Sequence, residues 1–163
     1  AGRLGFACEE SAGATLRRRD GRLWTTDKDG IAAACLAAEI TARTGADPAA
    51  YYTGLTAALG EPLADRVEGP ATRAQKAQLA ALTAADLPAR SLAGEAVTAV
   101  LDRAPGNGQP LGGIKVCTAN GWFAARPSGT EDLYKVYAES FRDETHLRQL
   151  MREARQLVDA ALA

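Results

Sequence analysis

The last third of the sequence alternates apolar and polar residues in two short runs, and this pattern limits the possible folds more than any other feature. The runs cover residues 114–118 and 133–141. Alternation of this kind is typical of strands with one buried face. Asn120-Gly121 follows the first run, and this dipeptide favours a tight turn. The sequence therefore predicts that residues 122–126 pair with the first run as an antiparallel hairpin, and that the second run extends the sheet.

A helix with one apolar face is predicted at the C-terminal end. Asp143 is a suitable N-cap. The residues after it repeat apolar side chains with the spacing of a helix that packs on one side. These residues are Leu147, Leu150, Met151, Ala154, Leu157, Val158 and Ala161. The pattern indicates that this helix packs on the predicted sheet, which gives an α+β arrangement.

The first part of the chain has a different pattern. Residues 4–24 contain isolated apolar positions and turn residues, and we interpret them as loop and hairpin. Asp27 is a candidate cap for a helix over residues 28–44 that ends at Gly45. A second helix is expected over residues 48–59.

A Gly-Glu-Pro turn at residues 60–62 predicts a boundary between two parts of the chain. A strand is expected at residues 63–68. Thr72 and Gln75 then form a capping-box pattern for a helix that reaches about Leu82. A short strand near residues 97–101 follows before the hairpin.

Composition excludes several classes of protein. The 163 residues carry 19 basic and 20 acidic side chains, which disfavours binding to nucleic acid or to an anionic membrane surface. No apolar run approaches the roughly 20 residues that span a bilayer. The three cysteines, Cys8, Cys35 and Cys117, suit neither a disulfide framework nor a zinc site, so we expect a cytoplasmic protein. Cys35 and Cys117 are expected to be small core residues.

The beginning of the chain differs from the usual start of a free-standing domain. There is no initiator Met, and Ala1 to Gly5 lead at once into a small polar loop. A domain usually begins with an element that holds its terminus in place. We therefore expect the chain to be a piece of a longer protein.

The segment after the predicted hairpin combines side chains that suit a phosphate. Arg126 offers a guanidinium fork, Ser128 and Thr130 offer hydroxyls, and Gly129 lets main-chain N–H groups approach a ligand. Lys135 adds a point charge. The alternative is an ordinary surface turn, and from the residues alone the two interpretations are about equally supported.

An acidic loop near the N-terminus suits a neutral polyol. Glu9 can accept hydrogen bonds from two vicinal hydroxyls, and Ser11 can donate or accept. The alternatives are a solvated acidic loop, which the residues alone favour, and part of a site for a hard cation such as calcium.

Two further residues carry weaker signals. Lys28 follows a Thr-Thr-Asp segment and is a candidate ligand contact, although from the residues alone a solvated side chain explains it better. His146 is the only histidine, and no serine or cysteine in a nucleophile motif accompanies it. A catalytic triad is therefore not predicted.

Four segments together resemble the α-D-phosphohexomutase superfamily, and its phosphoglucomutase branch more than the others. They are GFACEESAG at residues 5–13, WTTDKDG at 24–30, AEITARTG at 38–45 and NGWFAARPSGTE at 120–131. The resemblance covers essentially the whole chain in the right order. It implies that residues 1–60 are the C-terminal remnant of a three-layer α/β domain, the sugar-binding third domain of the family. Residues 61–163 would be the phosphate-binding fourth domain, an α+β fold like that of the TATA-binding protein.

The resemblance also implies which residues bind the substrate. Glu9 and Ser11 match the loop that holds sugar hydroxyls. Arg126, Ser128, Gly129 and Thr130 match the loop that holds the non-reacting phosphate, and Lys28 and Lys135 match basic contacts. Cys8 stands where the family usually has glycine, which reduces the backbone freedom of the first loop.

The chemical centre of the family is absent from the chain. Members transfer phosphate from a serine in a Ser-His-Asn-Pro-type loop and hold magnesium in an Asp-Gly-Asp-Gly-Asp-type loop, and neither pattern occurs here. The resemblance therefore implies an inactive recognition part of a mutase for glucose 1-phosphate and glucose 6-phosphate. Its partners would be the hexose phosphate and the missing N-terminal domains, and those domains would use Mg²⁺ and glucose 1,6-bisphosphate. The alternatives are a phosphomannomutase, a phosphoglucosamine mutase or a non-catalytic phosphosugar-binding module.

Overall fold

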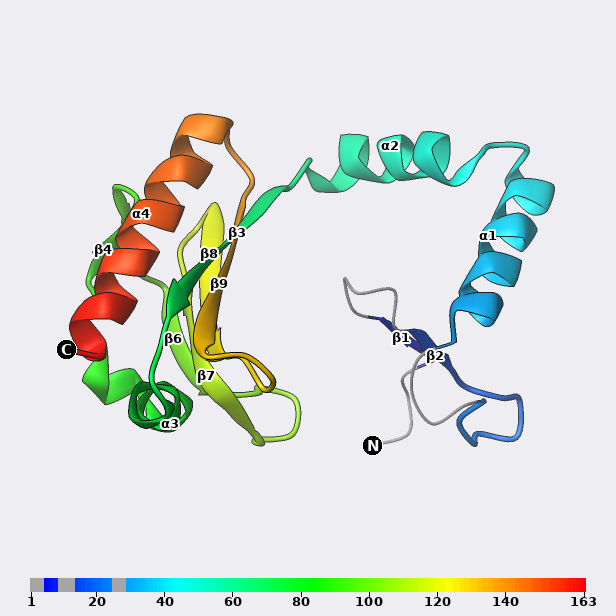
Figure 1. The fold of residues 1–163 in the computed structure, drawn as a ribbon. Helices are drawn as coiled ribbons and strands as arrows, with labels where there is room; N and C mark the ends of the chain where they lie inside the picture. The colour runs from blue at the N-terminus through cyan, green and yellow to red at the C-terminus, as the bar shows by residue number, and fades with distance from the viewer. Residues whose placement is uncertain (1–4, 9–13, 25–28) are drawn as a thin grey trace. The chain divides into compact units, whose positions relative to one another are not determined.

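The computed structural model describes residues 5–8, 14–24 and 29–163 (Figure 1). The chain divides into two compact units, Ala1–Leu59 and Gly60–Ala163. Each unit is described separately. In the described part of the chain, no helix is both long enough and apolar enough to cross a membrane.

The first unit begins with a small hairpin, as the sequence predicts. Strand β1 (Phe6–Cys8) pairs antiparallel with β2 (Ala14–Leu16), with Ala7 opposite Thr15. An isolated bridge joins Arg17 and Leu23 further along. The described part of this unit then continues into two helices.

Helix α1 spans Gly30–Thr44 and ends as the sequence predicts. Gly45 adopts φ 72°, in the left-handed region that glycine tolerates, and its N–H donates to the Thr41 carbonyl. The N-cap is Asp29, whose carboxylate accepts from the main chain of Ala32 at 2.9 Å. The predicted cap, Asp27, was therefore wrong by two residues, because Asp29 is the acid whose carboxylate reaches the third N–H of the helix.

Neither helix of the first unit has a buried residue. Helix α2 spans Pro48–Leu59 and is capped by Asp47, whose carboxylate accepts from Ala50 N at 2.9 Å. The predicted apolar stripe of α1 is present in sequence, but Ile31 is 80% exposed. Cys35 is also exposed, so the expectation that it is a core residue was wrong for this structure.

The second unit is built on a five-stranded antiparallel sheet. Its order is β3-β9-β8-β7-β6, so the strand nearest the start of the unit pairs with the last one. The bounds are β3 (Leu63–Pro70), β6 (Ala99–Arg103), β7 (Pro110–Cys117), β8 (Gly121–Pro127) and β9 (Leu133–Ser140). A separate pair, β4 (Ser91–Leu92) with β5 (Glu95–Ala96), follows the 3₁₀ turn η1 (Ala84–Asp86).

The predicted hairpin is confirmed. Strands β7 and β8 pair across the Asn120-Gly121 turn, with Cys117 opposite Trp122. Thr118 closes the turn, because its main-chain N–H and its hydroxyl both donate to the Gly121 carbonyl, at 2.8 and 3.1 Å. Gly113 on β7 has a close-packing role: a Cβ there would collide with the carbonyl oxygen of Ala125 on the neighbouring strand.

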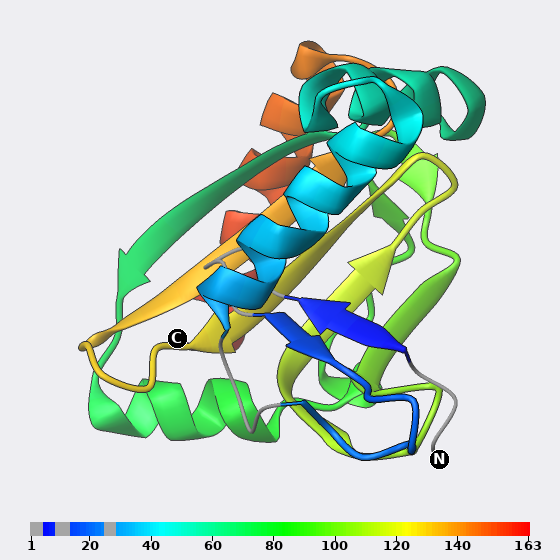
Figure 2. The ribbon, with the colours of Figure 1, turned by 90° about the vertical axis from the view of Figure 1, so that its right-hand side faces the viewer.

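Two helices cover one face of the sheet and enclose the core. Helix α3 (Arg73–Ala81) packs on β7 and β8, and α4 (Glu144–Ala161) packs on β3, β8 and β9 (Figures 1 and 2). The alternating strand residues that face them are buried together with the apolar stripe of α4. The largest fully buried side chains are Tyr134, Phe123, Leu79, Leu92, Ile114, Leu150, Val116, Val136 and Val158. This confirms the predicted α+β packing.

The local signals for both helices are also confirmed. The Thr72 hydroxyl accepts from Gln75 N, and the Gln75 side chain accepts from Thr72 N. Asp143 caps α4 by accepting from His146 N at 2.8 Å. The two elements are tied together at one end, because Gln75 and Gln78 donate to the carbonyls of Leu162 and Ala161.

Candidate functional site

The loop at residues 128–132 joins β8 to β9 and is closed by main-chain hydrogen bonding. Ser128 N donates to the Leu133 carbonyl at 2.9 Å, directly after the last register pair of the two strands, Pro127 with Tyr134. The loop therefore projects from the end of a buried two-strand ladder, at the position that the alternating pattern predicts.

Side chains fix the base of this loop. Ser128 is buried, and its Oγ lies 3.3 Å from both the carboxylate and the main-chain N of Glu131. Lys76 on α3 donates to the Glu131 carbonyl at 2.6 Å and pairs with Asp132 at 3.5 Å. The second half of the loop is therefore held by a helix that is distant in sequence.

The tip of the loop offers unused donors. Gly129 and Thr130 are exposed, and none of the hydrogen bonds among the described residues uses their main-chain N–H groups or the Thr130 hydroxyl. A Cβ added to Gly129 would meet nothing within 4 Å. Open space in front of free N–H and O–H donors is the arrangement that an oxyanion requires.

Arg126 adds a positive charge that no described acid neutralises. Its guanidinium donates to the Tyr137 hydroxyl at 3.1 Å, and Cζ lies 5.5 Å from the centre of that ring. Among the residues that the structure describes, no carboxylate forms an ion pair with Arg126. The tyrosine therefore holds the guanidinium without consuming its charge, and leaves the remaining N–H groups for a ligand.

The positive charge of Lys135, in contrast, is paired with carboxylates. It lies opposite Arg126 in the β8–β9 ladder, but its ammonium group pairs with Glu68 at 3.6 Å and with Glu131 at 3.3 Å. Only 19% of its side chain is exposed. A phosphate that used Lys135 would have to share it with two carboxylates.

Three residues that the sequence assigns to the substrate lie outside the described residues. These are Glu9 and Ser11 in the acidic loop and Lys28 before α1. Their roles stay predictions. Within the described part of the chain, no three His, Cys, Asp or Glu side chains gather as a metal site.

A buried polar network was not predicted from the sequence. Ser140 Oγ lies 2.8 Å from His146 Nδ1, and His146 Nε2 lies 3.9 Å from Glu95. Glu95 accepts two hydrogen bonds from Asn120, and the bond from the Asn120 side chain is the main cause that lowers its pKa to about 2.

A serine, a histidine and an acid in a row form the arrangement of a nucleophilic triad, but the burial of the serine and the histidine excludes this role. Ser140 is 0% exposed and His146 is 4% exposed. Ser140 Oγ also accepts from the main chain of Arg142 at 3.1 Å. No substrate can reach this hydroxyl, so the network is structural: it joins the hairpin turn, β5 and the start of α4. Glu95 lies on the local β4–β5 pair and meets His146 of α4 only through tertiary packing, which no local signal in the sequence shows.

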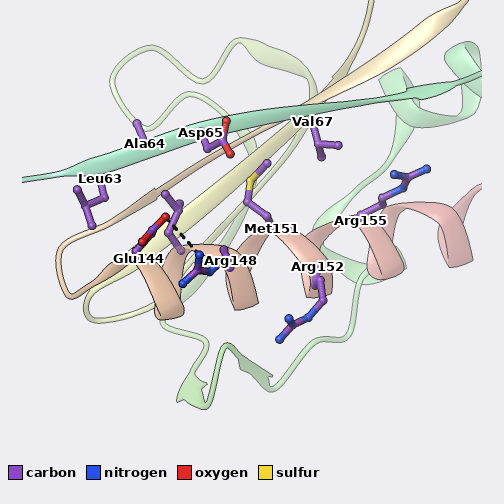
Figure 3. Close-up of a pocket in the computed structure, with 10 residues that line it drawn as sticks. Leu63, Ala64, Asp65, Val67, Glu144, Arg148, Met151, Arg152 and Arg155 are labelled. Carbon is purple, nitrogen blue, oxygen red and sulfur yellow. Dashed lines mark ion pairs between the residues drawn. The ribbon is translucent and has the colours of Figure 1, made fainter.

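A groove between β3 and α4 has a volume of about 640 Å³ (Figure 3). Leu147 and Met151 line it, together with arginines of α4. Arg148 pairs with Glu144 at 3.3 Å, as the dashed line in the figure marks. The groove contains none of the predicted substrate residues. The loop at residues 128–132, with Arg126, is therefore the candidate site.

Comparison with known proteins places both units in one family. The sequence model described as phosphoglucomutase/phosphomannomutase, alpha/beta/alpha domain III, matches residues 1–59. The one described as phosphoglucomutase/phosphomannomutase, C-terminal domain, matches residues 77–157. The chain belongs to the phosphoglucomutase/phosphomannomutase family, which confirms the resemblance and the mixed α/β fold.

Individual relatives agree with this assignment. The chain is 51% identical over 162 residues to a phosphoglucomutase from Komagataeibacter xylinus, a match that covers 99% of this chain and 29% of that protein. A crystal structure of a phosphoglucomutase/phosphomannomutase family protein from Burkholderia thailandensis matches with a TM-score of 0.59 and 21% identity. This match covers 96% of this chain and 28% of that one, and it shows the fold alone. The chain thus spans less than a third of the length of these relatives.

Proposed function

We propose that this chain is the substrate-recognition part of a phosphoglucomutase that interconverts glucose 1-phosphate and glucose 6-phosphate. In this proposal, the loop at residues 128–132 and Arg126 bind the phosphate group that is not reacting. The observation that carries the proposal is the guanidinium of Arg126, which no described acid neutralises, beside a loop whose donors at Gly129 and Thr130 have no partner among the described residues. The name of the 51% identical relative favours the glucose substrate.

The reaction requires recognition in two orientations. The parent enzyme would phosphorylate a sugar monophosphate, let the bisphosphate turn around, and then remove the other phosphate. A recognition loop that binds phosphate through N–H and O–H donors accepts either end of glucose 1,6-bisphosphate, because both ends carry the same group. Glu9 and Ser11 would hold the vicinal hydroxyls whose places interchange on turning. Orientation and charge neutralisation would be the contribution of this chain to catalysis.

The transferring group belongs elsewhere in this proposal. A phosphoserine and Mg²⁺ would be held by the part of the protein outside this chain, and the metal would supply charge neutralisation at the transferring phosphate. No step assigned to this chain passes through the metal, and we expect the chain alone to be inactive. A hexose phosphate substrate and the free cysteines of the chain favour a cytoplasmic location.

Arg126→Ala in the full-length protein tests the function. A charge-assisted contact to phosphate contributes about 1.5–3 kcal/mol, so we expect kcat/KM for glucose 1-phosphate to fall about 10-fold or more. The assay contains Mg²⁺ and glucose 1,6-bisphosphate. Arg148→Ala is the matched control, because Arg148 pairs with Glu144 on the surface of α4. Unchanged kinetics in the Arg126 variant would remove this residue from the site.

The second candidate function is mutase activity on another hexose or amino-sugar phosphate. The matched family model names phosphomannomutase beside phosphoglucomutase, and the phosphate loop does not distinguish the sugars. A panel of glucose, mannose and glucosamine phosphates separates these activities. If the complete protein lacked both the serine and the magnesium loops, a non-catalytic phosphosugar-binding module would be the better interpretation.

A further inference from the structure

The proposed phosphate-binding loop already holds an anion of its own. One carboxylate oxygen of Glu131, Oε2, lies 3.3 Å from Ser128 Oγ and 3.3 Å from Lys135 Nζ. Two of the groups assigned to the substrate phosphate are therefore engaged by the same internal carboxylate oxygen. A ligand that used both of them would have to replace Glu131.

The geometry allows the carboxylate to leave without moving the loop. The main chain of Glu131 is fixed at both polar groups: its N–H donates to Ser128 Oγ at 3.3 Å, and its carbonyl accepts from Lys76 at 2.6 Å. The side chain, in contrast, is 54% exposed. Rotation about the side-chain bonds can carry the carboxylate into water while the backbone stays in place.

Displacement leaves no buried charge behind. Lys135 keeps its second partner, Glu68, at 3.6 Å, and Glu131 becomes hydrated on an exposed loop. The incoming phosphate has more acceptor oxygens and more charge than one carboxylate, and Arg126 and the donors at Gly129 and Thr130 are free to bind it.

We propose that Glu131 is a resident anion of the phosphate-binding loop and that the substrate phosphate displaces it. The proposal rests on the proposed function. Its consequence is selectivity: an anion must outcompete Glu131 for Ser128 and Lys135, so a singly charged carboxylate ligand is rejected and a phosphate dianion is accepted.

Glu131→Gln separates this role from a purely structural one. Glutamine keeps the length of the side chain and the main-chain contacts, but it removes the charge. If Glu131 competes with phosphate, the variant binds phosphate more tightly. If Glu131 only supports the loop, the variant binds phosphate equally well or more weakly.

Inorganic phosphate is titrated into the full-length protein by calorimetry, with thermal melting to verify folding. We expect Glu131→Gln to lower the Kd about two- to fivefold, the range given by loss of one partly exposed ion pair. Asp132→Asn is the matched control: it removes the same charge from the next position, but Asp132 pairs with Lys76 and not with Lys135. Its Kd should change less than that of the Glu131 variant.

Two other outcomes have separate meanings. Unchanged or weaker phosphate binding in Glu131→Gln, with binding lost in Arg126→Ala, overturns the resident anion and leaves the proposed function in place. Absence of phosphate binding in the wild-type protein overturns both. A crystal structure of the wild-type protein with phosphate at the loop gives a test that needs no variant: Glu131 still within hydrogen-bond distance of Ser128 and Lys135 would contradict the proposal.

Discussion

The two units contain equally well-formed helices but differ in what those helices bury. Helices α1 and α2 of the first unit have no buried residue, whereas α4 of the second unit buries five, among them Leu150 and Val158. N-caps are present in both units, and Gly45 terminates α1 in the first. The comparison shows that local signals determine where a helix begins and ends, while burial depends on an apolar partner surface, which in the second unit is the sheet.

The largest expected effect is a cavity in the core of the second unit. Phe123→Ala removes a fully buried ring, and we expect the free energy of unfolding to fall by about 3–5 kcal/mol. Tyr52→Ala removes an aromatic ring from the exposed surface of α2, and it should cost less than about 0.5 kcal/mol. Urea unfolding of the 163-residue chain, followed by tryptophan fluorescence, measures both. Equal losses in the two variants would break the contrast between the units.

An intermediate effect is expected at Glu95, with a defined pH dependence. The pKa of Glu95 is lowered from 4.5 to about 2 by hydrogen bonds from Asn120, so the charged form stabilises the fold. This stability is fully present above pH 4.5 and is lost as the pH falls toward 2. Glu95→Gln should lower the free energy of unfolding by about 1.5–3 kcal/mol at pH 7. It should also make the free energy of unfolding less dependent on pH in the acid range.

An acid in the first unit provides the control for Glu95. Hydrogen bonds from the main chain and side chain of Arg22 lower the pKa of Asp20, but both side chains are exposed. Solvent screens these exposed contacts, so Asp20→Asn should change the pH dependence of the free energy of unfolding in the acid range less than Glu95→Gln does. If the loss of stability in acid depended more on Asp20 than on Glu95, the expected difference between the two units would be contradicted.

Substitutions at two glycines should give effects of opposite sign. Gly113→Ala places a Cβ against the Ala125 carbonyl in the second unit and should destabilise the chain by about 1–3 kcal/mol. Gly54→Ala lies inside α2, where a Cβ meets nothing within 4 Å, and should stabilise that helix by about 0.8–1 kcal/mol. Thermal unfolding monitored by circular dichroism measures both. If Gly113→Ala stabilised the chain, β7 and β8 would be able to move apart without loss of stability.

The sequence predicted those elements whose signals are local. The Asn120-Gly121 hairpin, the capping box at Thr72 and the apolar repeat of α4 each depend on residues close together in the chain, and all three are confirmed. The error at Asp27 has the same origin: two acids stood near the helix start, and only their geometry decides which one reaches Ala32.

Contacts between distant segments could not be predicted in this way. β3 pairs with β9 across about sixty residues of chain, and this pairing brings Glu68 to Lys135. The sequence suggested Lys135 as a point charge, because the pattern around it identifies neither the nearby Glu131 nor the distant Glu68 as its partner. The candidate loop was found from its residue types. Whether each cation near it is paired with a carboxylate depends on the fold, and the residue types do not show it.

Helix α3 connects the candidate loop to the far end of the chain. Lys76 donates a hydrogen bond to the Glu131 carbonyl. Gln75 and Gln78 on the same nine-residue helix donate to the carbonyls of Leu162 and Ala161. These hydrogen bonds of one helix therefore join the last turn of α4 to the backbone of the loop. The C-terminal residues thus support the loop indirectly, through the helix that holds its backbone.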